Sequence, residues 1–353
     1  MGAIRDRPPP GGYNGPVLPT PVDDGSDEAF VRTRCYRDGK LDDEDFPLDM
    51  VSEHLDQEGT VVWVDLCGPS SDQLHALEAE LGLHELAVED ALGRHQRPKL
   101  DHYDDHLFLT CHAVELDLDA ETPLRKTECD TFINPRWLIT VHHDRRFPID
   151  EVVARWDRSA QLAQHGTSFL LYGLLDVVVD GYLDLVQGLD DYFDDVADAI
   201  FSERPIPPDR QRQWFRMRRE LVHFHRLVGP TRETVSALMR REQGLIAEPL
   251  HPYYQDVYDH VLRANESTEA LRDLVSSIVE TNLSLRDYRQ NQIMKKVTSW
   301  AAVVAVPTLI TGYYGMNVPY PGYGDTWGVW ASVALIAVCA GALWLLFRRK
   351  DWL

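Results

Sequence analysis

The fold is decided by a stretch near the C-terminal end, residues 295–317, which reads KKVTSWAAVVAVPTLITGYYGMN. After its two lysines no charged residue occurs until Asp325, and the residues that follow are again uncharged as far as Phe347. Each uncharged interval contains enough apolar residues to cross roughly 30 Å of hydrocarbon. We therefore predict two membrane spans, at about residues 297–314 and 327–347. A buried core helix is the alternative for each one, but two in tandem with basic flanks favour membrane spans.

Basic residues flank both predicted spans on the same side. Lys295 and Lys296 precede the first span, and residues 348–353 begin with Arg-Arg-Lys directly after the second. The outer loop between the spans, residues 315–326, contains neither lysine nor arginine. The positive-inside rule then predicts a multi-pass protein of the cytoplasmic membrane with both termini in the cytoplasm. The lipid bilayer is thus an expected partner.

The composition excludes several classes of protein. The 353 residues carry a formal charge of −22 at pH 7, which disfavours binding to nucleic-acid phosphates. An apolar fraction of 44% is typical of a folded protein rather than a disordered one. The sequence contains neither GxxxxGKS nor GxxxxGKT, so we expect no nucleotide partner. The five cysteines show no CxxC spacing, so we expect neither disulfides nor a cysteine zinc site.

The part before the spans divides by pattern. Residues 1–28 are rich in proline and glycine and predict a disordered tail without a signal peptide. Residues 29–148 contain β-branched runs separated by helix-like segments, which predicts a cytoplasmic α/β domain. The runs are 60–66, 107–110 and 137–141. Residues 149–250 lose the strand pattern and predict a helical hairpin region with helices at 168–202 and 208–243.

These two helical segments differ in charge. The first is rich in aspartate near its end, and the second is rich in arginine near its start. The residues are Asp190, Asp191, Asp194, Asp195 and Asp198 in the first and Arg210, Arg212, Arg216, Arg218 and Arg219 in the second. We interpret them as antiparallel helices whose opposite charges pair across a solvated face. A patch that binds anionic lipid or nucleic acid is the alternative.

A third helical segment is the most informative one. No proline occurs between Pro252 and Pro307, and no glycine occurs before Gly312, so nothing breaks a helix across nearly sixty residues. These residues would reach on the order of 85 Å, and we expect one long helix over residues 251–314 that includes the first span. A lone helix of this length is rarely stable, so copies of itself or other helices should pack against it.

Polar and small residues recur on this helix at spacings of three and four. They are Glu280, Ser284, Asp287, Asn291, Met294, Thr298, Ala301, Ala305 and Thr308. Acidic and amide groups at one end of this stripe give way to small apolar and hydroxyl groups within the span. Small residues either allow close helix packing or leave an open lumen, so periodicity alone does not choose between a packing seam and a pore.

A four-residue motif, Tyr314-Gly315-Met316-Asn317, ends the first span. Gly-Met-Asn between two terminal spans, with a basic end after the second, resembles the signature of the CorA family of magnesium and cobalt channels. Two further segments match that family. They are His-Gln-Arg-Pro-Lys at 95–99, after Val-Glu-Asp at 88–90, and Asp-Val-Tyr-Asp-His at 256–260. The resemblance implies a funnel-shaped homopentamer with an α/β cytoplasmic domain and one long pore-lining helix per subunit.

The resemblance implies a selectivity filter formed by Tyr314, Gly315, Met316 and Asn317. Mg²⁺ gives up its water reluctantly, so a ring of Asn317 carbonyl oxygens would recognise the hydrated ion rather than strip it. Gly315 would give the turn backbone freedom, and Tyr314 would support the filter from behind. Without the resemblance, a helix C-cap is the preferred interpretation of Asn317.

The resemblance also implies roles along the pore helix. The implied pore-lining residues are Glu280, Asn291, Met294, Val297, Ala301, Ala305 and Thr308. Asn291 corresponds to a narrow polar ring at the cytoplasmic end, and Thr308 to a hydroxyl that can hold a hydrated ion. Met294, Val297 and Ala301 correspond to a hydrophobic constriction that gates by excluding water. At position 297 periodicity and resemblance disagree, because the stripe selects the next residue instead.

Regulation by cytoplasmic Mg²⁺ is a further implication of the resemblance. Asp90 and Asp256 would bind Mg²⁺ between adjacent subunits, and their mutual repulsion without the ion would loosen the funnel and open the gate. Mg²⁺ would thus be both substrate and regulatory ligand, with no cofactor and no enzymatic activity. The structural alternatives are a helix-end residue for Asp90 and a charge stabilised by the helix dipole for Asp256.

We therefore expect passive Mg²⁺ uptake driven by the membrane potential. A related Zn²⁺, Co²⁺ or Ni²⁺ transporter, with or without proton coupling, stays an alternative because imidazole suits those softer ions. The histidines concerned are His142, His143, His223 and His225. No histidine or cysteine, however, lies on the stripe. A membrane-anchored metal sensor or hydrolase is an alternative from another class, although the sequence contains no HExxH motif.

Overall fold

The computed structural model describes residues 30–93, 96–118, 120–201, 207–241, 244–317 and 319–352. The predicted disordered tail at 1–28 lies outside these residues. The chain divides into two compact units. The first comprises Met1–Val114, Lys126–Gly181 and Pro230–Tyr258, and the second comprises Glu115–Arg125, Tyr182–Gly229 and Asp259–Leu353.

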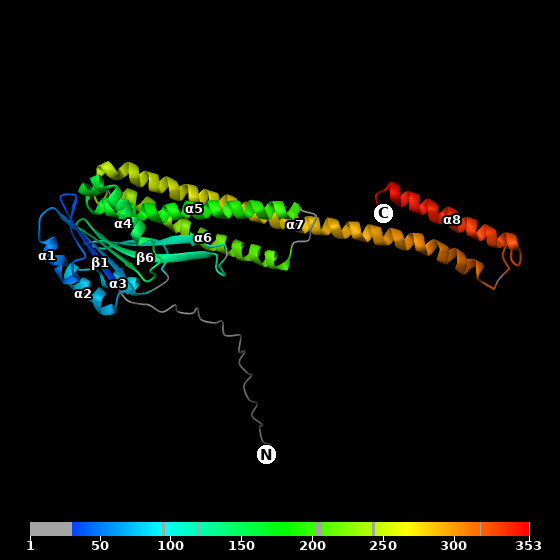
Figure 1. Ribbon diagram of the computed structural model, residues 1–353, viewed down its shortest axis with the longest axis horizontal. Helices are drawn as coiled ribbons and strands as arrows, with labels where there is room; N and C mark the ends of the chain where they lie inside the picture. The colour runs from blue at the N-terminus through cyan, green and yellow to red at the C-terminus, as the bar shows by residue number, and fades with distance from the viewer. Residues whose placement is uncertain are drawn as a thin grey trace, which may run out of the picture. The chain divides into compact units, whose positions relative to one another are not determined.

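Seven strands form one sheet in the order β2-β1-β3-β7-β6-β5-β4. Their bounds are β1 Phe30–Arg37, β2 Lys40–Glu44, β3 Thr60–Cys67, β4 Lys99–His102, β5 Leu107–Leu116, β6 Leu124–Asn134 and β7 Trp137–His142. Strands β3 and β7 run parallel, whereas β1 pairs antiparallel with β2 and β3, and β6 pairs antiparallel with β7. The predicted β-branched runs lie in β3, β5 and β7, so the expected α/β domain is confirmed (Figure 1).

One face of the sheet is covered by three short helices (Figure 1). They are α1 Val51–Leu55, α2 Ser71–Leu81 and α3 Glu85–Leu92, with the 3₁₀ turn η1 Leu48–Met50 before them. Alternation along β3 directs Val62, Val64 and Leu66 into this core, where all three are fully buried. Helix α2 begins with a capping box, in which Ser70 Oγ accepts from the Gln73 backbone N–H while the Gln73 side chain accepts from the Ser70 N–H.

Trp156 joins the other face of the sheet to the first long helix. This residue of α4 Ile149–Arg158 meets Trp63 of β3 edge to face, with ring centroids 4.9 Å apart. Its Nε1 donates to the Leu170 carbonyl at 3.1 Å. A Cβ at Gly173 would lie 2.4 Å from the same Nε1, so only glycine permits this approach. The start of the long helix is thereby fixed to the sheet.

Four long helices follow the sheet domain. Their bounds are α5 Thr167–Phe201, α6 Pro208–Arg241, α7 His251–Tyr314 and α8 Thr326–Arg349, with 3₁₀ turns η2 Ala160–His165 and η3 Glu248–Leu250 between elements. The predicted helices at 168–202, 208–243 and 251–314 agree with α5, α6 and α7 to within two residues. Helix α7 contains 64 residues, continues through Pro307, and is about 96 Å long at 1.5 Å per residue.

The predicted charge pairing between α5 and α6 is wrong for the described residues. The aspartates at 190–198 are exposed. Among the described residues, none of these aspartates forms an ion pair with an arginine of α6. Arg212 instead pairs with Asp209, and Arg219 pairs with Glu220, both on α6 itself. An exposed ion pair contributes little in water, so nothing forces long side chains to meet across the two helices.

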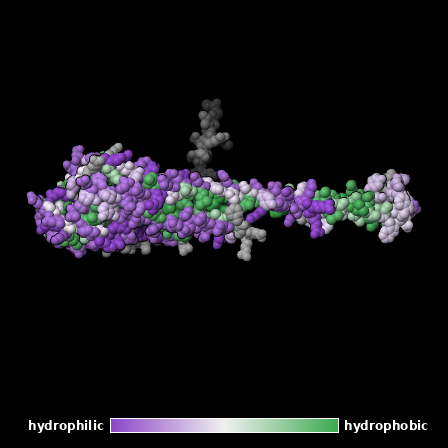
Figure 2. Space-filling model, turned by 90° about the horizontal axis from the view of Figure 1, so that it is seen from above, coloured by the Kyte–Doolittle hydropathy of each residue, from purple (hydrophilic) through white to green (hydrophobic). Residues whose placement is uncertain are grey.

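Two helices have the length and composition of membrane spans. They lie within Glu248–Tyr314 and Thr326–Arg349, and they appear as the hydrophobic segment in Figure 2. Only 6% and 0% of their most apolar windows are buried inside the chain. The chain itself leaves this apolar surface uncovered. Lipid or further copies of the chain must therefore shield it from water.

Candidate ion-conduction site

The stripe predicted on α7 is a strict heptad seam. Its members alternate spacings of four and three from Glu280 to Thr308, and the next two positions of the same repeat are Gly312 and Gly315. A mean period of 3.5 residues is that of the contact seam in left-handed helix bundles. Every position of this seam is exposed in the single chain. Val297, which stands one residue off the repeat, is 61% exposed as well.

Helix α8 returns alongside the last turns of α7 (Figure 1), and the residues of α7 that are buried lie on the side opposite the seam. Ser299 is fully buried there, and Val303, Val306 and Ile310 are partly buried. The seam is therefore directed away from α8. Symmetry-related copies could meet along it, whereas one chain alone does not close a pore.

Asn317 lies just beyond the end of α7. The last helical turn closes through the Gly315 N–H, which donates to the Thr311 carbonyl at 2.9 Å, and the Met316 N–H, which donates to the Tyr313 carbonyl at 3.3 Å. Asn317 follows these bonds and its side chain is exposed. The C-cap interpretation of Asn317 is therefore wrong, because the helix has already ended at Tyr314.

The role predicted for Gly315 needs correction. Its φ is not in the left-handed region, so the turn does not use the conformational freedom of glycine. A Cβ at this position would lie 3.0 Å from the Thr311 carbonyl oxygen. Glycine here therefore avoids a close contact that any other residue would make with this carbonyl.

A cluster of tyrosines holds the outer loop, and sequence analysis did not predict it. Tyr314 is half-buried and packs against Tyr320 with ring centroids 4.9 Å apart, while Tyr313 lies 6.2 Å from Tyr320. Tyr323 meets Tyr320 at 5.3 Å. The pairs of Tyr320 with Tyr314 and Tyr323 are edge to face, and each such pair is worth about 0.5–1.5 kcal/mol beyond area burial. The recurrence of tyrosine at 313, 314, 320 and 323 was the available signal.

Thr308 has a defined hydroxyl orientation. Its Oγ1 donates to the Val304 carbonyl at 3.1 Å, which uses its single proton. A hydroxyl retains lone pairs after donating, so the exposed side of this group can only accept. Water bound to a cation donates hydrogen bonds outward. The orientation of Thr308 therefore suits a hydrated cation.

Asp90 is held by two partners within its own unit. It lies on α3, and its Oδ1 accepts from Gln96 Nε2 at 3.1 Å while its Oδ2 is 2.6 Å from Lys99 Nζ. Lys99 also approaches Asp101 Oδ2 at 2.6 Å. Both Asp90 and Lys99 are partly exposed, with 28% and 29% of the side-chain surface accessible. Asp90 is therefore an ion-paired carboxylate at the surface and not merely a helix-end residue.

Asp256 stands on the second turn of α7 and is exposed. The first turn is anchored to α5, because the Tyr254 hydroxyl donates to the Ser168 carbonyl at 2.8 Å. The Tyr172 hydroxyl donates to Asp176 Oδ2 at 3.1 Å. Burial raises the pKa of Tyr172, and the charges of Asp176 and Asp256 raise it further. Asp256 thus lies in an acidic part of the first unit.

Three of the four histidines of the softer-metal alternative have structural partners, whereas His225 Nδ1 is buried without a hydrogen-bond partner among the described residues. His142 Nε2 lies 3.3 Å from the buried Asp65 Oδ2, and His143 Nε2 lies 2.9 Å from the Ala91 carbonyl. His223 Nδ1 lies 3.2 Å from Glu220 Oε2. Across the described part of the chain, no three His, Cys, Asp or Glu side chains are grouped to hold a metal.

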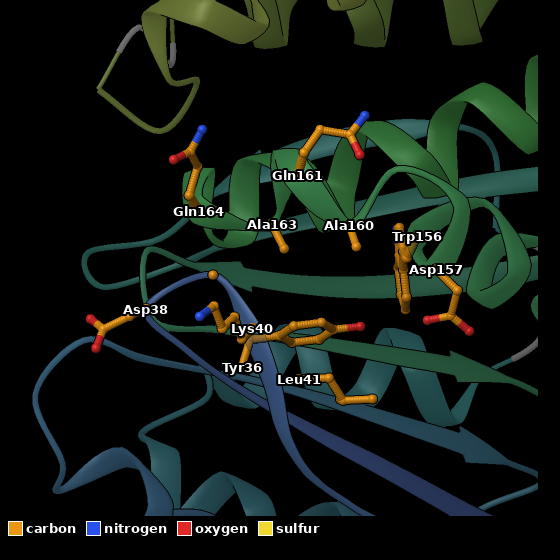
Figure 3. A pocket seen from close by; sticks show the side chains of 11 residues that line it. Tyr36, Asp38, Lys40, Leu41, Trp156, Asp157, Ala160, Gln161, Ala163 and Gln164 are labelled. Atoms are coloured by element: carbon orange, nitrogen blue, oxygen red, sulfur yellow. The ribbon is translucent and has the colours of Figure 1, made fainter.

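A pocket of about 470 Å³ opens beside the β1–β2 hairpin (Figure 3). Tyr36, Lys40 and Leu41 come from the hairpin, and Trp156 comes from α4. The hairpin turn approaches η2 closely because Gly39 lacks a Cβ, which would lie 2.6 Å from the Gln164 backbone. None of the predicted site residues lines this pocket.

Comparisons with known proteins agree with this architecture. The chain is 29% identical over 299 residues to the cobalt/magnesium transport protein CorA of Thermotoga maritima, covering 83% of this chain and 84% of that protein. It is 29% identical over 293 residues to the putative metal ion transporter YfjQ of Bacillus subtilis, covering 82% and 89%.

Solved structures share the fold. The complete CorA magnesium transporter of Methanocaldococcus jannaschii superimposes with a TM-score of 0.73 at 21% identity, covering 92% of this chain and 98% of that one. Full-length CmaX gives a TM-score of 0.67 at 22% identity, covering 94% and 100%. The family model for CorA-like Mg²⁺ transporter proteins matches residues 58–349, so the chain belongs to the CorA family.

Proposed function

We propose that this protein is a Mg²⁺ uptake channel of the cytoplasmic membrane, with a path lined by the α7 seam of a homopentamer. One observation carries the proposal. The exposed seam runs without interruption from Glu280, through small residues and Thr308, to the exposed Asn317 at the helix end. Membership of the CorA family and a relative named for cobalt/magnesium transport support the same function.

The domain plan of this proposal follows the chain. Residues 29–148 and 149–250 form the cytoplasmic regions, and α7 continues from them through the membrane. The loop at 315–326 lies outside, and the second span at 327–347 returns the basic end at 348–353 to the cytoplasm. The basic residues on the inner flanks support this orientation.

Recognition in this proposal begins with the water shell of the ion. A ring of Asn317 side chains, one from each subunit, offers neutral carbonyl oxygens that accept hydrogen bonds from Mg²⁺-bound water. A neutral acceptor binds the hydrated ion without holding it as a carboxylate ring would. The hydroxyl of Thr308 lies on the same seam and repeats this recognition, because its proton is already committed to Val304.

In this proposal the apolar part of the seam forms the gate. Met294 and Ala301 present no polar side-chain atom able to replace water, so a narrow ring of them excludes the hydrated ion. Val297 stands one residue off the repeat. Rotation of α7 about its axis would turn the Val297 side chain towards the lumen in place of Thr298. Asn291 then forms the polar ring below the constriction, and Ala305 leaves a wider lumen above it.

The driving force requires no nucleotide. Moving two charges across 100 mV releases about 4.6 kcal/mol, which is roughly a thousandfold bias in concentration. Regulation in this proposal uses Asp90 and Asp256 as ligands for cytoplasmic Mg²⁺ between subunits. Asp256 is exposed and Asp90 is partly exposed, so both carboxylates can be reached by an ion from outside the chain, which supports a shared site.

Co²⁺ is the second candidate ion, because the Thermotoga maritima relative is named for cobalt and magnesium. Zn²⁺ is disfavoured since the seam and the filter motif contain neither histidine nor cysteine.

The test is flux into liposomes that contain the purified protein under an inside-negative potential. We expect Mg²⁺ entry without proton movement, and its loss in Asn317→Ala. Proton-linked Zn²⁺ entry without Mg²⁺ entry would instead indicate the softer-metal transporter. Absence of any metal flux would refute the channel and favour the membrane-anchored sensor.

A further inference from the structure

Lys99 occupies a position between two carboxylates. Its Nζ lies 2.6 Å from Asp90 Oδ2 and 2.6 Å from Asp101 Oδ2, and it lies 5.3 Å from the ring centroid of Phe108. Lys99 begins β4, so the short strand fixes its backbone beside α3. The ammonium therefore reaches both carboxylates from a rigid base through a flexible four-carbon stem.

Asp90 has no oxygen that is free of a partner from its own chain. Gln96 Nε2 donates to Oδ1, and Lys99 donates to Oδ2. A cation that binds Asp90 directly must therefore displace or share one of these donors. The amide of Gln96 is neutral, so of these two donors Lys99 is the one that opposes the incoming cation electrostatically.

A lysine side chain carries a positive charge at neutral pH. Glu128 lies beside the cluster and accepts from the Gln96 backbone N–H at 3.1 Å. Lys99 is thus a permanent positive charge beside Asp90 at neutral pH.

We propose that Lys99 is a tethered cation that competes with Mg²⁺ for Asp90 and so sets the Mg²⁺ concentration at which the regulatory site fills. This inference rests on the proposed regulation through Asp90. When Mg²⁺ binds, Lys99 gives up Asp90 and keeps Asp101, so its charge is never left unpaired. Asp101 thereby lowers the free-energy cost of exchanging Lys99 for Mg²⁺ at Asp90.

The size of the effect follows from the exposure of the pair. A partly exposed ion pair contributes little free energy in water. Loss of the pair with Lys99 therefore corresponds to roughly a twofold to fivefold change in the affinity of Asp90 for Mg²⁺. Removal of Lys99 should therefore lower the Mg²⁺ concentration at half-occupancy by about that factor. The change is towards tighter Mg²⁺ binding, whereas a mere loss of structure would weaken it.

The experiment uses the full-length protein in lipid nanodiscs and measures protection from chymotrypsin as Mg²⁺ is titrated. We expect Lys99→Gln to lower the half-protecting Mg²⁺ concentration roughly twofold to fivefold, and Lys99→Arg to leave it near the wild-type value. Lys126→Gln is the matched control, because this lysine is exposed on β6 of the same sheet. Asp90→Asn should raise the half-protecting concentration.

Two results would overturn the inference, and they are distinguishable. If Asp90→Asn raises the midpoint but Lys99→Gln does not lower it, Lys99 does not compete although Asp90 binds Mg²⁺. If Asp90→Asn leaves the midpoint unchanged, the regulatory role of Asp90 itself fails, and the Lys99 inference fails with it. Conduction is judged independently from liposome flux.

Discussion

Asp130 makes the stability of the sheet domain depend on pH. This residue of β6 is 2% exposed, and Thr110 Oγ1 donates to its Oδ1 at 2.6 Å. Burial, together with the charges of Glu128 and Asp90, raises its pKa from 3.8 to about 8, although the hydrogen bond from Thr110 acts in the opposite direction. Between these two values the folded state holds a proton that the unfolded state has released. Because the folded state binds more protons, stability falls as pH rises from about 4 to about 8.

The magnitude follows from the shift. Each pH unit within this window costs about 1.4 kcal/mol, so raising the pH from 5 to 7 costs the wild type about 3 kcal/mol from this residue. Asp130→Asn removes the titration and preserves the acceptor for Thr110, since the amide Oδ1 replaces the carboxyl oxygen. The variant should therefore melt above the wild type at pH 7, with a smaller difference at pH 5.

The assay is thermal unfolding of the full-length protein in detergent, followed by circular dichroism at pH 5 and pH 7. Asp49→Asn is the control, because Asp49 is exposed on the 3₁₀ turn η1. It should melt like the wild type at both values. If Asp130→Asn shows the same pH dependence as the wild type, Asp130 is ionised in the folded state and the reasoning is refuted.

Three further predictions concern conduction. Thr308→Val should slow Mg²⁺ flux into liposomes by up to roughly tenfold, because one acceptor for the ion's water is lost, whereas Thr311→Val, off the seam, should not. Gly315→Ala should reduce flux because its Cβ would lie 3.0 Å from the Thr311 carbonyl; unchanged flux would mean that the turn tolerates the contact. Tyr320→Ala should weaken discrimination of Mg²⁺ against Na⁺, whereas Tyr320→Phe should keep it, since ring packing and not the hydroxyl holds the loop. Equal selectivity in the two variants would contradict this.

Local signals in the sequence were sufficient for the helices and the fold class. The absence of proline and glycine for nearly sixty residues after Pro252 predicted one long helix, because helix continuation depends on residues near in sequence. Helix α7 nevertheless continues through both Pro307 and Gly312 to Tyr314. The β-branched runs likewise located β3, β5 and β7. The heptad alternation of the stripe was present in the sequence, and the structure adds that its whole length is exposed.

Contacts between distant segments could not be predicted in the same way. The pair of Asp90 and Lys99 depends on where α3 stops relative to β4, and no spacing rule gives that position. The charge pairing of α5 and α6 failed because helix rotation decides whether opposite charges meet. The sequence also did not reveal why residue 315 is glycine. The reason is a close approach to the Thr311 carbonyl oxygen and not a backbone conformation that glycine favours.

The most direct test of the central claim asks whether the α7 seam lines the ion path. Thr308→Cys places a thiol on the seam, and Ile310→Cys places one on the opposite face, both in a Cys339→Ala background because Cys339 lies on α8. Mg²⁺ flux into liposomes is then measured with and without external Cd²⁺, which binds thiolate. We predict that Cd²⁺ blocks flux through Thr308→Cys and leaves Ile310→Cys unaffected. Block of Ile310→Cys without block of Thr308→Cys would contradict the account.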